Sequence, residues 1–189
     1  MFATIFLAIA LMQAPATTHD VCDIDRSALL ELDQRAFDQD FDGGWRKIAD
    51  NGCKKEAADL IRDWRQEHAS ESTTLYWHEG QLRAEIGENA AAVELFKKAI
   101  KAPEEDAGFG WNLYVEGSVA FLNRDKVALQ SARDTLAVLP KPEGLGRMVD
   151  LDGNPVEIEW PMNLNVLDAL IQCWDETYSN AYKCVAKTS

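Results

Sequence analysis

The residues best suited to bind a metal ion are three aspartates that alternate along one short stretch. Asp38, Asp40 and Asp42 precede Gly43, which copies the opening of a calcium-binding EF-hand loop. Such a loop takes oxygen ligands at alternate positions and needs a glycine at the sixth. Its twelfth position should be a bidentate Glu, but here it is Ala49. We therefore favour a helix-ending acidic turn over a calcium site, and we predict no metal and no cofactor.

No set of residues matches a catalytic motif. The three histidines, His19, His68 and His78, do not form the His-Glu-x-x-His motif of metalloproteases. The chain also lacks a Gly-x-Ser-x-Gly elbow, a phosphate loop and a dinucleotide fingerprint. We predict that the protein is not an enzyme, and a hydrolase of unknown substrate is the least favoured alternative.

The N-terminus is typical of a secretory signal. The first twelve residues are an apolar run, and a bilayer-spanning helix needs about 20. Ala14-Pro15-Ala16 supplies the small residues of a cleavage site. We predict a signal peptide over residues 1–16 and a single mature domain over residues 17–189, periplasmic or secreted. A buried N-terminal helix is the alternative, because no Lys or Arg precedes the apolar run.

The four cysteines predict disulfides. An even number in an exported chain indicates two bridges, and no Cys-x-x-Cys pair of the kind that holds zinc occurs. Three connectivities are open. We favour Cys22–Cys53 and Cys173–Cys184, because each bridge would clip a terminal segment onto its neighbour.

The net charge of −13 narrows the choice of partners. Nucleic-acid binding needs a basic face, and anionic membranes attract basic segments. We expect no nucleic-acid partner and no membrane anchoring after signal cleavage. The acidity permits a basic protein partner, although it is also a common means of staying soluble.

Hydrophobic periodicity predicts helices along most of the chain. Apolar residues recur three and four apart, and capping or breaking residues bound the segments. The expected helices cover 27–37, 45–50, 54–68, 73–86, 89–102, 111–122, 126–139, 162–174 and 176–185. The stretch between the expected helices 126–139 and 162–174 does not have this helical spacing. Its residues alternate instead on both sides of Asp152-Gly153. It predicts a small β-hairpin insertion at about 144–160, followed by a C-terminal helical cap.

An internal repeat organises these helices. The turn residues Gly52, Gly87 and Asn123 are spaced by 35 and 36 residues. Each is followed five residues later by a small residue: Ala57, Ala92 and Ala128. A helical hairpin cannot bury its apolar face alone, so repeated hairpins stack on one another.

The middle unit carries aromatic, small and turn residues in a characteristic order: Tyr76, Gly80, Gly87, Ala92, Phe96 and Ala99. It resembles a tetratricopeptide repeat, best over residues 73–103. The resemblance implies an all-α fold, a right-handed array of antiparallel helical hairpins. In that family the first helix of each hairpin lines a concave groove that binds peptides or helices of other proteins.

Carried over by position, the resemblance implies that Thr74, Trp77, Gln81 and Glu85 face this groove. Trp77 is the strongest candidate, since an exposed tryptophan is a good binding anchor. The alternative is that Trp77 is core. We therefore expect an exported module that binds a protein or peptide. The second hypothesis is an inhibitor or immunity-type protein that blocks one enzyme through the insertion near Gly144–Trp160.

Overall fold

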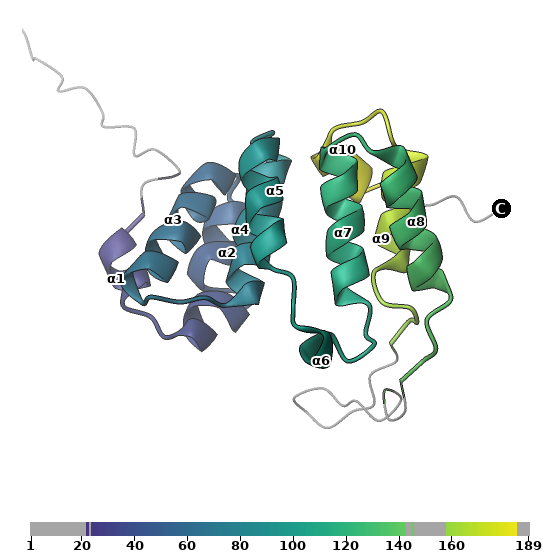
Figure 1. The fold of residues 1–189 in the computed structure, drawn as a ribbon. Coiled ribbons are helices and arrows are strands. Elements are labelled where there is room, and N and C mark those ends of the chain that lie inside the picture. The colour runs from purple at the N-terminus through teal and green to yellow at the C-terminus, as the bar shows by residue number, and fades with distance from the viewer. Residues whose placement is uncertain (1–21, 23, 143–144, 146–157, 185–189) are drawn as a thin grey trace, which may run out of the picture.

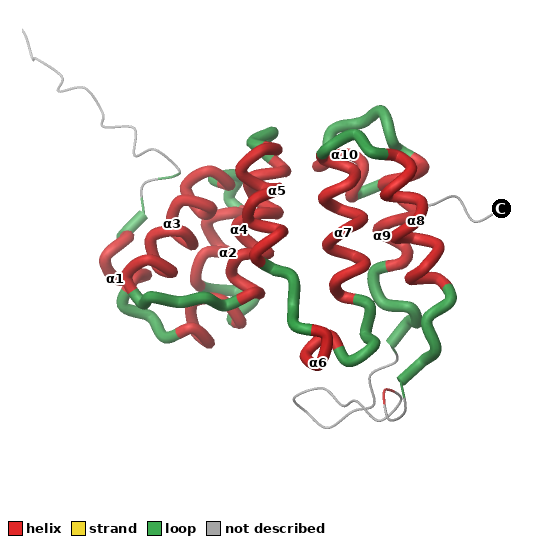
Figure 2. The backbone as a smooth tube through the Cα atoms, viewed as in Figure 1, coloured by secondary structure: helices red, strands yellow, loops and turns green. Residues whose placement is uncertain are grey.

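The computed structural model describes residues 22, 24–142, 145 and 158–184, which form helices and no strand (Figures 1 and 2). In chain order the helices are α1 (Arg26–Leu30), the π-helical turn η1 (Arg35–Gln39), α2 (Gly44–Asp50), α3 (Lys54–Glu67), α4 (Thr73–Glu85), α5 (Asn89–Lys98), α6 (Pro103–Asp106), α7 (Trp111–Leu122), α8 (Lys126–Ala137), α9 (Leu164–Gln172) and α10 (Tyr178–Tyr182). The all-α prediction is confirmed for this part of the chain. The predicted signal peptide and most of the predicted β-hairpin, residues 146–157, lie outside the described residues.

One predicted helix is wrong. The pattern indicated a single helix over 27–37, but the chain leaves α1 after Leu30 and starts η1 at Arg35. The carboxylate of Asp33 accepts a hydrogen bond from the backbone N–H of Ala36 at 2.9 Å. A side chain that caps a new turn in this way competes with continuation of the preceding helix.

Consecutive helices pack in pairs. The most extensive contacts join α2 with α3, α3 with α4, α4 with α5, and α7 with α8. The last two described helices fold back, so that α9 packs on α7 and α8 (Figure 1). Helix α10 packs on α9 and on α4. Gly52 and Gly87 end their helices with φ of +89° and +84°, where a glycine carries little strain. In the third unit Arg124, one residue after Asn123, takes the positive φ.

Helix α4 separates two core clusters. Leu75 and Leu82 belong to the N-terminal cluster, whereas Tyr76 and Trp77 belong to the C-terminal one. The N-terminal cluster is built mainly from η1, α2 and α3, and its largest members are Phe37, Trp45, Leu60, Ile61 and Trp64. The C-terminal cluster is built mainly from α5 and α7 to α10, and its largest members are Phe96, Tyr114, Phe121, Leu167 and Tyr178.

Gly80 allows α4 and α5 to approach closely. A Cβ atom at this position would lie 2.6 Å from two ring carbons of Phe96, which real Cβ atoms essentially never do. The buried Phe96 ring therefore occupies the space that a side chain on α4 would need. This is the physical reason for a small residue at this point of the repeat.

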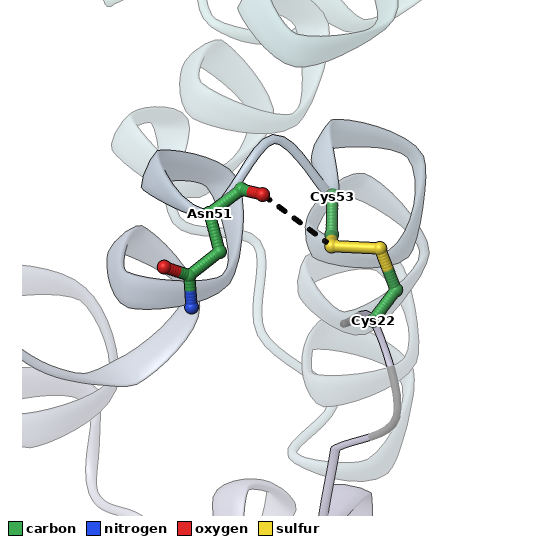
Figure 3. Close-up of a disulfide and its surroundings, with 3 residues drawn as sticks. All are labelled: Cys22, Asn51 and Cys53. Carbon is green, nitrogen blue, oxygen red and sulfur yellow. Dashed lines mark hydrogen bonds between the residues drawn. A yellow bond between two sulfur atoms is a disulfide. The ribbon is translucent and has the colours of Figure 1, made fainter. Parts of the chain in front are cut away.

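Both predicted disulfides are present, Cys22–Cys53 and Cys173–Cys184. The first ties the start of the described chain to the residue before α3, and the Cys53 sulfur lies 3.9 Å from the carbonyl oxygen of Asn51 (Figure 3). The second joins the end of α9 to the residues after α10. None of the described helices has both the length and the apolar character needed to cross a membrane.

Candidate partner-binding site

A surface hollow of about 530 Å³ lies where α2 meets α4. We call it the α2–α4 hollow. It is lined by Phe41, Trp45, Arg46, Ala49, Asp50, Lys54, His78, Gln81, Leu82, Glu85 and Lys183. These residues come from the turn before α2, from α2, from the start of α3, from α4 and from the end of α10. Packing of the helices therefore assembles the site, and no continuous stretch of sequence contains it.

The tight connection between η1 and α2 positions one wall of the hollow. Gly44 has φ of +52°, and a Cβ atom there would lie 2.0 Å from the carbonyl oxygen of Phe37. Only glycine fits such a close approach of two backbone segments. The turn brings the carboxylate of Asp38 within 2.9 Å of the Nε1 of Trp45, which donates a hydrogen bond to it.

Asp38 is the buried centre of the site. Its side chain is 0 % exposed, and its Oδ1 accepts hydrogen bonds from Trp45 and from the Nδ1 of His78, the latter at 2.7 Å. The guanidinium of Arg46 lies 3.6 Å from the same oxygen. Burial alone would raise the pKa of Asp38. The hydrogen bond and charge of His78, the Trp45 hydrogen bond and the charge of Arg46 outweigh burial, so the pKa is lowered. The carboxylate is therefore ionised at neutral pH.

This carboxylate fixes the orientation of the His78 ring. An ionised carboxylate only accepts hydrogen bonds, so the Nδ1 of His78 must carry the proton. The other ring nitrogen, Nε2, has no hydrogen-bond partner among the described residues, and His78 lines the hollow. Nε2 is an acceptor in the neutral ring and a donor in the charged ring, so it can pair with either kind of group on a bound molecule.

An exposed aromatic residue stands at the rim. Phe41 is 79 % exposed, although it is large and apolar. The guanidinium of Arg46 lies 4.3 Å from the ring centroid of Trp45 and 5.5 Å from that of Phe41. It also donates to the backbone carbonyl of Asp38. Arg46 is thus held against both rings, at distances typical of cation–π contacts.

The structure separates the four residues predicted to bind a partner. Gln81 and Glu85 line the hollow, and Glu85 is paired with Lys54. Thr74 is half-buried on α4 and does not line the hollow.

Trp77 is core, as the alternative interpretation held, so its prediction as a binding anchor has to be corrected. It is 4 % exposed, its ring centroid lies 4.3 Å from that of Phe96, on which it stacks, and 5.1 Å from that of Trp111, in an edge-to-face arrangement. Burial of the whole indole between two helices leaves no surface for a partner. The residue that the sequence analysis missed is Phe41, and its only signal was a large apolar side chain between two aspartates in a turn.

The acidic stretch forms a turn. Asp38 is engaged with Trp45 and His78, and the Oδ1 of Asp40 accepts a hydrogen bond from the backbone N–H of Asp42 at 3.0 Å. In the described part of the chain, one group of three potential metal ligands lies close together, Cys22, Cys53 and Glu56. Its two cysteines are joined in a disulfide and offer no thiolate.

On the C-terminal side of the hollow, α10 covers α4. The Nε2 of Gln81 donates to the hydroxyl of Tyr182 at 3.2 Å, and the hydroxyl of Tyr114 on α7 lies 3.0 Å from the same oxygen. Surface that the tetratricopeptide resemblance assigns to a partner is therefore occupied here by the chain's own last helix. The open part lies between α2 and α4.

Over the residues that the structure describes, the fold is helical and disulfide-bonded, and the site is a polar hollow with an exposed aromatic residue at its rim. Comparison with protein-family models, with curated proteins and with solved structures found no match. Function must therefore be argued from the geometry of the site.

Proposed function

We propose that the protein binds a peptide or protein segment in the α2–α4 hollow and performs no catalysis. The observation that carries the proposal is the exposed Phe41 beside polar groups that the protein itself holds in place. Aromatic anchors next to fixed hydrogen-bonding groups are typical of binding sites, because little side-chain entropy is lost on association.

The polar groups suit a peptide. Lys54 is paired with Glu85 and Arg46 with Asp38, so the charges of these four residues are balanced within the protein. Two uncharged groups of the lining could form hydrogen bonds with a ligand: the Nε2 of His78 and the side-chain amide of Gln81. A peptide backbone offers both N–H donors and C=O acceptors. One apolar side chain of the ligand would contact Phe41.

We further propose that the protein is an exported, tetratricopeptide-like array, periplasmic or secreted. Two disulfides fit an oxidising compartment. The paired packing of α2 with α3, α4 with α5 and α7 with α8 is what such an array requires. Positive φ at Gly52, Gly87 and Arg124, at or beside the turn positions of the sequence repeat, also supports this proposal.

The test begins with selection of peptides from a displayed random library on the disulfide-intact protein. Dissociation constants of the selected peptides are then measured for Phe41→Ala and for Val127→Ala. Val127 on α8 is a matched control, because it is 81 % exposed and lies outside the hollow. We expect Phe41→Ala to weaken binding about 10-fold or more, as removal of an anchor does, and Val127→Ala to leave it unchanged. Equal affinities in both variants would place binding elsewhere and refute the proposal.

A further inference from the structure

Two contacts hold His78 and leave one of its ring nitrogens open to the α2–α4 hollow. Its Nδ1 lies 2.7 Å from the Oδ1 of Asp38, and its ring centroid lies 5.2 Å from that of Trp45. Asp38 and Trp45 are both buried, whereas the His78 side chain is 16 % exposed. A ring held in this way loses little freedom when a ligand group meets its Nε2, so more of the interaction contributes to affinity.

The buried carboxylate of Asp38 suits a charged ring at His78. In the charged ring both nitrogens carry a proton, so Nδ1 still donates to Asp38 and Nε2 becomes a second donor. A carboxylate on the ligand would accept from Nε2 and place the ring between two carboxylates. Hydrogen bonds to ionised groups are roughly twice as strong as those between neutral groups. An anionic ligand group therefore gains more from His78 than a neutral peptide N–H does.

The other charges around His78 leave the sign of the hollow to the ring itself. They belong to Asp38 on η1, Arg46 and Asp50 on α2, Lys54 on α3, Glu85 on α4 and Lys183 after α10. Acidic and basic residues are equal in number in this set, so a charged ring gives the site a net positive charge. Asp50 and Lys183 are exposed and have no ion-pair partner within the described residues. Lys183 should attract a ligand anion, and Asp50 should repel it.

We propose that the hollow takes a ligand carboxylate at the Nε2 of His78, beside the apolar side chain that contacts Phe41. This inference rests on the proposed function, because it names the group by which the bound peptide is recognised. The carboxylate accepts a hydrogen bond from Nε2–H, and the neutral ring takes up one proton from the solvent as the ligand binds. The C-terminus of a peptide and the side chains of Asp and Glu all offer this group.

The first experiment measures the pH dependence of binding by calorimetry. Its probe is the tightest peptide from the library selection. Because binding takes up one proton, the dissociation constant should rise about 10-fold per pH unit above the pH at which the ring of the free protein loses its proton. The ring nitrogen NMR signals of the free protein give that pH. An affinity that stays constant or increases with pH in this range would mean that the ligand meets the neutral ring, and would overturn the proposal.

The second experiment removes the charge from the ligand. The same peptide is made with a C-terminal amide, and separately with each Asp replaced by Asn and each Glu by Gln. One of these changes should weaken binding about 10-fold or more, because the ring then loses its charged partner. The change that does so distinguishes a C-terminal carboxylate from a side-chain carboxylate. Equal affinities for all the forms would overturn the proposal.

The third experiment changes the protein. His78→Gln cannot take up the proton, so its binding should be weaker and should no longer depend on pH. Lys183→Gln should weaken binding of the charged peptide, and Asp50→Asn should strengthen it. Lys47→Gln is the matched control, because Lys47 is exposed on α2 and does not line the hollow, and it should bind as the wild type does. If His78→Gln fails to fold, the pH dependence of the wild type and the Lys183 and Lys47 variants still decide.

Failure of this inference can be told from failure of the proposed function. A peptide whose binding depends on Phe41, but not on any carboxylate or on pH, would keep the proposed function and overturn the carboxylate. A selection that yields no peptide dependent on Phe41 would overturn both.

Discussion

The two sides of α4 carry opposite kinds of surface. The N-terminal side faces η1, α2 and α3, where buried charges are paired and the α2–α4 hollow is open. The C-terminal side faces α5, α7 and α10, where aromatic rings pack together and the surface is already covered. His78 and Trp77 are neighbours in sequence and lie on opposite sides. Residue type alone therefore does not decide which side chain is available to a partner; the packing around α4 does.

The N-terminal side also holds an ion network across α3 and α4. Arg65 pairs with Glu79, and Arg83 pairs with Asp59 at 2.6 Å and with Glu88 at 2.8 Å. Glu79 and Arg83 are both buried. The C-terminal side has phenol groups instead, on Tyr114, Tyr178 and Tyr182. The two sides should therefore respond differently to mutation and to pH.

The largest effect should come from Trp77→Ala, which tests whether this residue belongs to the core. The change removes a buried indole stacked on Phe96, and truncation of a buried tryptophan typically costs about 3–5 kcal/mol. Urea unfolding followed by circular dichroism measures the loss. A cost below about 1 kcal/mol would mean that Trp77 is not core and could still contact a partner.

The next comparison is between the two disulfides, one on each side of α4. Their sequence separations are 31 and 11. The chain-entropy relation predicts a loss of about 4 kcal/mol for Cys22→Ser/Cys53→Ser and about 3 kcal/mol for Cys173→Ser/Cys184→Ser. Global unfolding in urea should show the larger loss for the first pair. The reverse order would indicate that the shorter bridge does more than close a loop.

The sequence predicts most of this fold from local signals. The apolar spacing and the flanking Gly110 and Asn123 mark the helix Trp111–Leu122, and the structure has it with the same bounds. The repeat at Gly87 and Ala92 predicts the α4–α5 hairpin. The pairing of the cysteines followed from the expectation that each bridge clips a terminal segment onto its neighbour. The helix and hairpin signals lie within a few turns of the elements that they predict.

The centre of the site could not be predicted in this way. Asp38 and His78 are 40 residues apart, and nothing local to either indicates that their side chains meet. Whether Trp77 is covered depends on Trp111 and Tyr114, which belong to a later hairpin. The exposure of Phe41 likewise depends on the turn that Gly44 allows. These are tertiary facts, and a single sequence carries no periodic pattern for them.

Acid should weaken the N-terminal side first, because of Asp59. Burial would raise its pKa, but the hydrogen bonds from Lys55 and Arg83 and the charges of Arg83 and Arg62 lower it from 3.8 to about 2. An acid with a lowered folded-state pKa stabilises the fold above its unfolded pKa. That stabilisation, about 2 kcal/mol, is lost as the pH falls from about 4 to 2.

Urea unfolding between pH 5 and pH 2 measures this loss, and Asp59→Asn is the control that should flatten the dependence. The variant removes the titrating group with little change of shape. If wild type and Asp59→Asn lose stability equally over this range, other carboxylates such as Asp38 dominate the acid response.

Alkali should instead weaken the C-terminal side. Burial raises the pKa of Tyr114 and of Tyr178 well above 10. The folded state therefore keeps these phenols protonated where the unfolded chain ionises them, and stability falls as the pH rises above about 10. Hydrogen exchange at high pH should show α10 opening before α3. Tyr178→Phe should reduce the loss of stability above pH 10. If the variant loses as much stability as the wild type, the loss does not come from Tyr178.

The smallest effect on stability should come from Phe41→Ala, and this result would sharpen the contrast with Trp77. The two residues are both aromatic, but Phe41 is 79 % exposed and contributes little burial. Exposed substitutions usually change stability by less than about 0.5 kcal/mol. Urea unfolding should therefore give nearly the same free energy of unfolding for Phe41→Ala as for the wild type. The same should hold for Val127→Ala. A loss above about 1 kcal/mol would mean that the contact of Arg46 with the Phe41 ring stabilises the turn before α2. Phe41 would then help to hold the hollow in shape. Weaker peptide binding by Phe41→Ala could not then be assigned to loss of a direct contact between the Phe41 ring and the peptide.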